Sequence, residues 1–241
     1  MKSTNKPIKK ETINWIGVVK DLGVVVLVYV AGQISVGLVV RWLAHGRDFA
    51  HAPEAVLGAY IVGGFTMVVS LLWLLKKRGI ARKSVLFFKK PGLKDVGMVL
   101  LGYGMYFMVL TVVLVFIREF VPAINLDQKQ DVGLKNIASN LLPMTYIALA
   151  ILPAISEEML FRGFLNTRLK LHKISSIVSA LMVSVLFGLS HGQLNVGIDT
   201  FILSMVMIYV LGTRRNLWVS VGIHMLKNTL AFLGLFVFKI F

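Results

Sequence analysis

The chain has 241 residues, of which 57% are hydrophobic and only 15% are charged. A soluble domain of this length carries a much larger charged fraction, so the composition excludes an ordinary water-soluble enzyme and indicates a membrane protein. The formal net charge is +15, and the chain contains no cysteine. The lack of cysteine excludes disulfide bonds, thiolate zinc sites and cysteine nucleophiles.

Apolar runs of about 20 residues, long enough to cross a bilayer, recur along the chain. They predict an all-α fold, a polytopic transmembrane helical bundle of about seven spans. We expect one membrane-embedded domain over 1–241, with a basic arm at 1–20 and a motif-bearing core at 141–238. The expected spans are 22–43, 55–75, 96–117, 141–171, 174–191, 197–212 and 217–238. The first run is too long for the apolar part of a signal peptide and is expected to remain as a span.

Lysine and arginine in the connecting segments predict the orientation, because cytoplasmic loops carry an excess of them. The N-terminal arm and the segments 76–94 and 168–173 are basic, whereas 44–54 and 118–140 are not. We therefore expect a multi-pass cell-membrane protein with a cytoplasmic N-terminus and an external C-terminus. The basic residues are expected to face the lipid bilayer and not nucleic acid, because no nucleic-acid recognition fold accompanies them.

The stretch SEEMLFRG (156–163) places three charges within the fourth apolar segment. We expect one helix over about 141–171, kinked at Pro153, and not a new helix starting at Ser156. A helix rises about 1.5 Å per residue, so Glu157 would lie roughly 17–21 Å from the cytoplasmic end, inside a hydrocarbon core of about 30 Å. Ionisable side chains at that depth are costly and indicate a functional site.

Three other polar side chains are expected at comparable depths. His191 of the fifth span would lie roughly 25 Å deep, and His224 and Asn228 of the seventh span roughly 12 and 18 Å deep. Together with Glu157 these residues predict one site built from three helices. His191 could hold a water molecule between its ring and Glu157.

Helix geometry separates the two adjacent glutamates. Glu158 and Arg162 are four positions apart and share a face, so we expect an ion pair that supports the site. Glu157 points elsewhere, without a local partner, which suits a general base. His224 and Asn228 also share a face, and together they could donate hydrogen bonds to an oxyanion.

Three motifs, EEMLFRG, FGLSH and HMLKN, lie in this order between Glu157 and Asn228. They resemble the signatures Glu-Glu-x-x-x-Arg, Phe-x-x-x-His and His-x-x-x-Asn of the CPBP intramembrane proteases, also called Abi proteins, which include the CAAX prenyl endopeptidases. The resemblance implies a glutamate-dependent peptidase with no cofactor. It implies that Glu157 activates water, His191 positions it, and His224 and Asn228 stabilise the tetrahedral intermediate, while the paired glutamate and arginine brace the site.

The resemblance also implies a substrate, namely a peptide or protein associated with the membrane. Bacterial members of the family are associated with peptide maturation and bacteriocin self-immunity. Lys227, inside the third motif, departs from the family pattern, and it could line the cavity or extend toward the cytoplasmic face.

Other interpretations stay open at this point. The two histidines and two glutamates could ligate zinc, since metal ligands often come from different helices. A non-catalytic membrane partner that binds a bacteriocin or a sensor kinase could carry the same polar cluster. A transporter also places polar residues at mid-membrane depth, although no internal repeat is visible. The sequence does not indicate an oligomeric state.

Overall fold

The computed structural model describes residues 12–44, 52–128, 132–134 and 137–239. Within these ranges the regular structure is entirely helical, which confirms the predicted all-α class. Most of the predicted basic arm and most of the predicted external loop 44–54 lie outside the described residues.

Six helices are long and apolar enough to cross a membrane. They are α1 (Trp15–Leu43), α2 (Pro53–Lys77), α4 (Leu93–Phe120), the composite helix Ser139–Leu171, α9 (Leu194–Arg214) and the helix Leu217–Val237, which begins with α10 (Leu217–Phe232). A seventh apolar helix, α8 (Ser176–Leu189), is about 21 Å long by the usual rise per residue. It falls short of a hydrocarbon core of about 30 Å. The short helix α3 (Arg82–Val85) lies in the basic segment after α2.

The first helix begins earlier than predicted. α1 starts at Trp15, so the described end of the expected arm is helical. Asn14 caps this helix, because its side-chain oxygen accepts a hydrogen bond from the backbone N–H of Gly17 at 2.9 Å. The helix therefore begins about two turns before the predicted start at residue 22.

The long fourth helix is present as predicted, and it is irregular. Its α-helical parts, α5 (Leu142–Tyr146), α6 (Leu152–Glu158) and α7 (Asn166–Leu171), are separated by the π-helical segments Ile147–Ile151 and Met159–Leu165. The first π segment ends two residues before Pro153, whose missing N–H removes one helical hydrogen bond. Ser156 lies inside the helix and donates its hydroxyl to the Leu152 carbonyl at 2.9 Å, so no new helix starts there.

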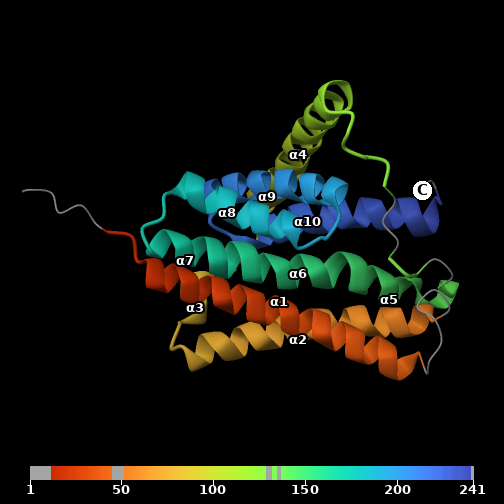
Figure 1. The fold of residues 1–241 in the computed structure, drawn as a ribbon, viewed down its shortest axis with the longest axis horizontal. Helices are drawn as coiled ribbons and strands as arrows, with labels where there is room; N and C mark the ends of the chain where they lie inside the picture. The colour runs from red at the N-terminus through yellow and green to blue at the C-terminus, as the bar shows by residue number, and fades with distance from the viewer. Residues whose placement is uncertain (1–11, 45–51, 129–131, 135–136, 240–241) are drawn as a thin grey trace, which may run out of the picture.

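The fourth helix occupies the middle of the bundle. Figure 1 shows α5, α6 and α7 running between the α1–α2 pair and the group formed by α8, α9 and α10. α4 packs against α9 and α10 and leans away from the rest. Leu160, Phe161, Phe164 and Leu165 are almost completely buried. Glu158 and Arg162 of the same helix are also fully buried and are therefore surrounded by protein and not by lipid.

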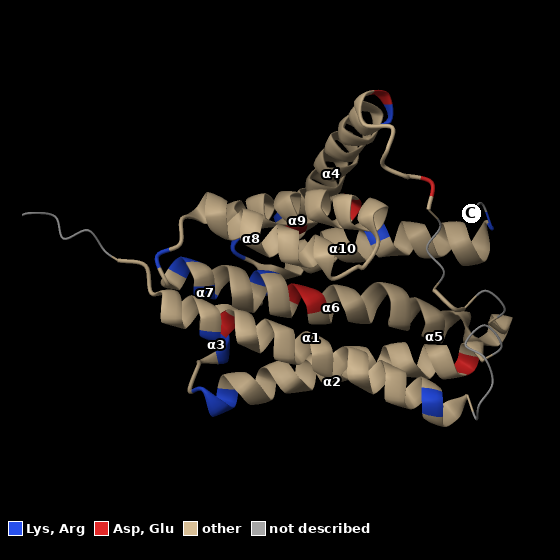
Figure 2. Cartoon of the chain, viewed as in Figure 1, with Lys and Arg blue, Asp and Glu red and all other residues tan. Residues whose placement is uncertain are grey.

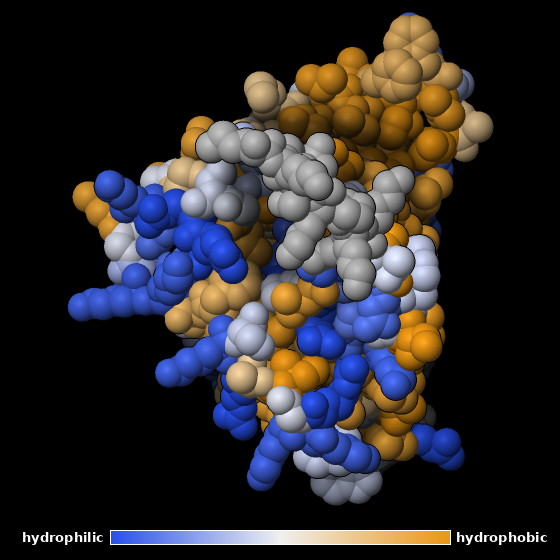
Figure 3. Space-filling model, turned by 90° about the vertical axis from the view of Figure 1, so that its left-hand side faces the viewer, coloured by the Kyte–Doolittle hydropathy of each residue, from blue (hydrophilic) through white to orange (hydrophobic). Residues whose placement is uncertain are grey.

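Basic residues gather at one end of the bundle, where α1 begins and where α2 and α7 end (Figure 2). Figure 3, which faces that end, shows hydrophilic side chains across it. Here the buried Asp21 of α1 accepts hydrogen bonds from Arg78, from Arg168 at 2.7 Å and from His172 at 2.7 Å. This carboxylate ties α1 to the ends of α2 and α7. The charge distribution fits a cytoplasmic assignment for this end, which stays a prediction.

Candidate active site

The fourth helix carries the predicted ion pair. Arg162 Nη1 lies 2.9 Å from Glu158 Oε1, and neither side chain has exposed surface. The pair follows from the four-residue spacing, which places both residues on one face. In such a dry environment each charge needs the other, because either one alone would be buried without compensation.

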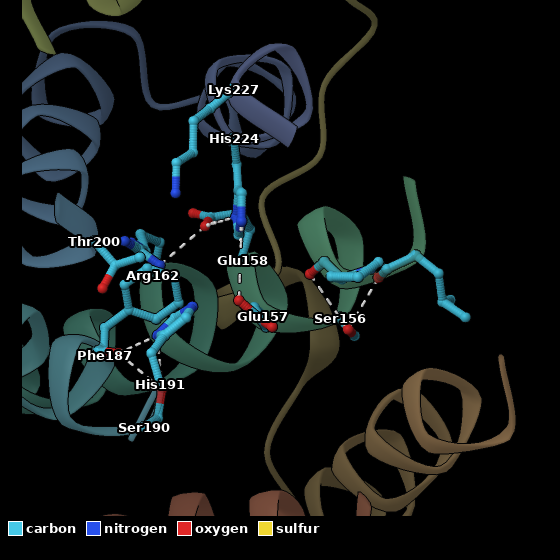
Figure 4. Close-up of polar contacts among 12 residues, drawn as sticks. Ser156, Glu157, Glu158, Arg162, Phe187, Ser190, His191, Thr200, His224 and Lys227 are labelled. Atoms are coloured by element: carbon cyan, nitrogen blue, oxygen red, sulfur yellow. Dashed lines mark hydrogen bonds and ion pairs between the residues drawn. The ribbon is translucent and has the colours of Figure 1, made fainter. Parts of the chain in front are cut away.

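α10 places His224 against both glutamates (Figure 4). Its Nδ1 lies 3.0 Å from Glu158 Oε1, and its Nε2 lies 3.9 Å from Glu157 Oε2. The first distance is that of a hydrogen bond in which Nδ1 donates to the carboxylate, and the second is too long for one. Nε2 therefore faces Glu157 without being bonded to it.

The cluster of Glu157, Glu158, Arg162 and His224 is one proton away from neutrality. Two carboxylates, one guanidinium and a neutral imidazole give one excess negative charge. Neutrality matters here because an uncompensated charge is costly inside a membrane protein.

Glu157 differs from its neighbour in accessibility. Its side chain is 20% exposed, whereas that of Glu158 has no exposed surface. Its Oε2 atom is buried and has no hydrogen-bond partner within the described residues, so the exposed surface belongs to other atoms of the side chain. A carboxylate oxygen that is not engaged by the protein can accept a proton from a bound water molecule.

Phe187 of the second motif connects the other members of the site. Its ring lies edge-on to those of His191 and His224, with centroids 5.0 and 5.8 Å apart. Its face lies 4.0 Å from the guanidinium carbon of Arg162. This cation–π contact stabilises a guanidinium whose Nε and Nη2 lack hydrogen-bond partners in the described part of the chain. The motif contained Phe187, but nothing in the sequence indicated this central contact.

His191 lies outside the fifth span, contrary to the prediction. α8 ends at Leu189, and the chain then turns through Gly192, whose φ of 71° favours glycine. The Nδ1 atom of His191 donates to the Phe187 carbonyl at 2.8 Å, so its Nε2 atom is free to accept a hydrogen bond. In Figure 4 the His191 ring lies on the same side of Arg162 as Glu157 does.

Tyr29 of α1 holds the turn that carries His191. Its hydroxyl donates to the carbonyl oxygen of Ser190. The contact joins residues far apart in sequence and outside any shared motif, so the sequence offered no indication of it. It fixes the turn against α1.

Asn228 is not hydrogen-bonded to the other predicted site residues. It lies one turn after His224 on α10 and is half-buried. Its side chain has no hydrogen-bond partner among the residues that the structure describes. The amide is therefore uncommitted, and its role as an oxyanion donor stays a prediction.

Lys227 points across to α9 and not toward the end of the bundle where the basic residues gather. Its Nζ lies 2.9 Å from Asp199 Oδ2. The other oxygen of Asp199 accepts a hydrogen bond from the hydroxyl of Tyr106 on α4. This chain of contacts joins three helices beside His224.

Within the described ranges no group of three or more His, Asp or Glu side chains is placed to hold a metal ion. Nδ1 of His224 and Oε1 of Glu158 are hydrogen-bonded to each other, so a metal would have to displace that bond to use either atom as a ligand.

The comparison with known families agrees with the motifs. Residues 139–230 match a family model described as type II CAAX prenyl endopeptidase Rce1-like. The match contains all three motifs and the cluster around Glu157, and it confirms the predicted resemblance to CAAX proteases. No curated protein and no solved structure matches the chain.

Proposed function

We propose that this chain, whose residues 139–230 match the CAAX protease family, is an intramembrane endopeptidase that uses Glu157 to activate water. The observation that supports the proposal best is the contrast between two neighbouring carboxylates. Glu158 is buried and paired, whereas Glu157 is 20% exposed and uncommitted. Packing alone would not require a partly exposed carboxylate beside His224.

In the proposed reaction Glu157 takes a proton from a water molecule held near Nε2 of His191. The resulting hydroxide attacks the carbonyl carbon of the scissile peptide bond, and the carbonyl oxygen becomes an oxyanion. The proton on Glu157 then passes to the nitrogen of the leaving amine as the C–N bond breaks. No covalent enzyme intermediate is required.

The oxyanion would be stabilised by the His224 Nε2–H and by the amide of Asn228. His224 donates through Nε2 only when its ring carries both protons, because Nδ1 already donates to Glu158. In that state, with Glu157 ionised, the four-residue cluster is neutral. Arg162 holds the Glu158 carboxylate and thereby orients the His224 ring.

The proposed substrate is a membrane-associated peptide or protein that enters from the cytoplasmic side. Peptide maturation and bacteriocin self-immunity are the roles we propose for its cleavage. A non-catalytic partner that binds a bacteriocin or a sensor would need the same fold but not the ionised state of Glu157. This difference separates the two functions experimentally.

The test compares peptides from cells that produce the wild-type chain or the Glu157→Gln variant, by mass spectrometry. The amide would keep the shape of the side chain and lose the base, so cleavage should fall by roughly 10²–10⁴-fold at an equal amount of protein in the membrane. Glu119→Gln, the same change at an exposed position near the end of α4, is the control and should cleave like the wild type. Undiminished cleavage by Glu157→Gln would reject the proposed base.

A further inference from the structure

The ionisable side chains near the candidate site fall into two groups by accessibility. Glu158 and Arg162 have no exposed surface, whereas Glu157, Lys227 and Asp199 keep 20%, 20% and 24% of theirs. Ionisable side chains within a membrane face the bundle interior or a wet cavity, because contact with lipid is too costly. The exposed part of each side chain in the second group is therefore expected to face water.

α10 places Lys227 beside the residues of the proposed chemistry. It follows His224 by three positions and precedes Asn228, about 15 Å along the helix from its first residue. Figure 4 shows its side chain extending beside His224 in the direction of Glu158. Lys227 is thus in the middle of the helix that runs from Leu217 to Val237 and not at either of its ends.

Asp199 fixes this ammonium group and leaves part of it unused. Nζ lies 2.9 Å from Asp199 Oδ2, and Tyr106 in turn holds the other carboxylate oxygen. An ammonium group has three N–H donors, and Asp199 is the hydrogen-bonding or ion-pair partner found for it among the described residues. Two donors therefore remain for a ligand.

The ligand that these donors fit is a neutral oxygen. Asp199 already balances the charge of Lys227, so a second carboxylate would meet its repulsion. The carbonyl groups of a peptide backbone carry no net charge. Inside a membrane they need hydrogen-bond donors, because an unsatisfied carbonyl there costs several kcal/mol.

We propose that Lys227 is a substrate-binding residue that donates hydrogen bonds to main-chain carbonyl oxygens next to the scissile bond. The proposal rests on the proposed peptidase function. Asp199 and Tyr106 position the ammonium group and do not touch the substrate. The alternative is a purely structural ion pair that joins α9 to α10.

A charge exchange separates these two roles. The full chain in nanodiscs is assayed with a mixture of internally quenched peptides, beside Glu157→Gln, Lys227→Met, Lys227→Arg and the double variant Lys227→Asp/Asp199→Lys. The double variant keeps an ion pair between the helices but puts no donor at position 227. We expect it to unfold at a higher temperature than Lys227→Met, though below the wild type because Tyr106 loses its acceptor on Asp199. We also expect kcat/KM to fall by roughly 10–100-fold through a higher KM, as in Lys227→Met. Lys227→Arg keeps donors and should retain most of the activity.

Recovery of both the unfolding temperature and kcat/KM in the double variant would overturn the proposal. If the double variant does not fold, the single variant Asp199→Asn is compared with the double variant Asp199→Asn/Lys227→Met. The ion pair is absent from both, so the comparison isolates the donors of Lys227. A further fall of roughly tenfold supports the donor role, and no further fall rejects it. Failure of the proposed base is recognised separately, because Glu157→Gln would then cleave like the wild type.

Discussion

Adjacent residues of the fourth helix have opposite surroundings, because a helix turns by about 100° per residue. Glu158 faces Arg162 and His224 in a dry interior, and Glu157 faces an accessible space. One position in the sequence thus distinguishes a structural carboxylate from a candidate base.

The buried pair should be far more important for stability than a surface pair. Arg162→Met would leave Glu158 buried with His224 as its remaining partner, at an expected loss of about 3–5 kcal/mol in the free energy of unfolding. Arg118→Met is the control, since the side chains of Arg118 and Asp127 are 68% and 82% exposed. That change should cost no more than about 1 kcal/mol. Unfolding in mixed micelles with increasing SDS measures both, and equal losses would contradict the expectation.

Contacts within one helix could be predicted at this scale, and contacts between helices could not. The Glu158–Arg162 pair follows from spacing alone. The hydrogen bond from His224 to Glu158 depends on how α10 is rotated against α6, which no spacing specifies. The partner of Lys227 likewise required the placement of Asp199 on a third helix.

Among the elements, α8 differs most from its prediction. An apolar run shows how much chain avoids water but not where the backbone turns, so the run 174–191 gave a span longer than α8. The turn brings α8 and α9 very close together at Gly188 and Gly197. The π segments of the fourth helix were also not predictable, because their composition resembles that of an ordinary membrane helix.

This close approach gives an expected outcome for Gly188→Ala. A Cβ atom there would lie 2.7 Å from the Gly197 carbonyl oxygen, so α8 and α9 must separate and the turn with His191 must move. A displacement of about 1 Å at a catalytic group can reduce turnover by roughly 10²-fold. Gly212→Ala on α9 is the control, since no described atom lies within 4 Å of its added Cβ. Equal peptide cleavage rates for the two variants would contradict a need for this contact.

For the whole molecule, hydropathy was sufficient for the class of fold and insufficient for the arrangement. The seven apolar segments are all helical, as predicted. Their apolar surfaces are chemically alike, so the sequence does not specify which helices are neighbours. The central position of the fourth helix and the outward lean of α4 therefore came from the structure alone (Figure 1).

The orientation in the membrane can be tested with single cysteines, because the chain has none of its own. Lys83→Cys lies on α3 at the basic end, and Asn125→Cys lies in the exposed connection after α4. A membrane-impermeant maleimide added to intact cells should label Asn125→Cys and should label Lys83→Cys only after the cells are opened. The unsubstituted chain is the control for background. The opposite pattern would reverse the predicted orientation.

The lean of α4 makes bilayer thickness relevant to the site. This helix is about 42 Å long by the usual rise per residue, well beyond a hydrocarbon core of about 30 Å, and mostly unburied. Hydrophobic mismatch of this kind is relieved by tilting, so a thicker bilayer would draw α4 more upright. Tyr106 on α4 holds Asp199, and Asp199 holds Lys227. Lipid composition would thereby influence the position of the ammonium group through two side-chain contacts.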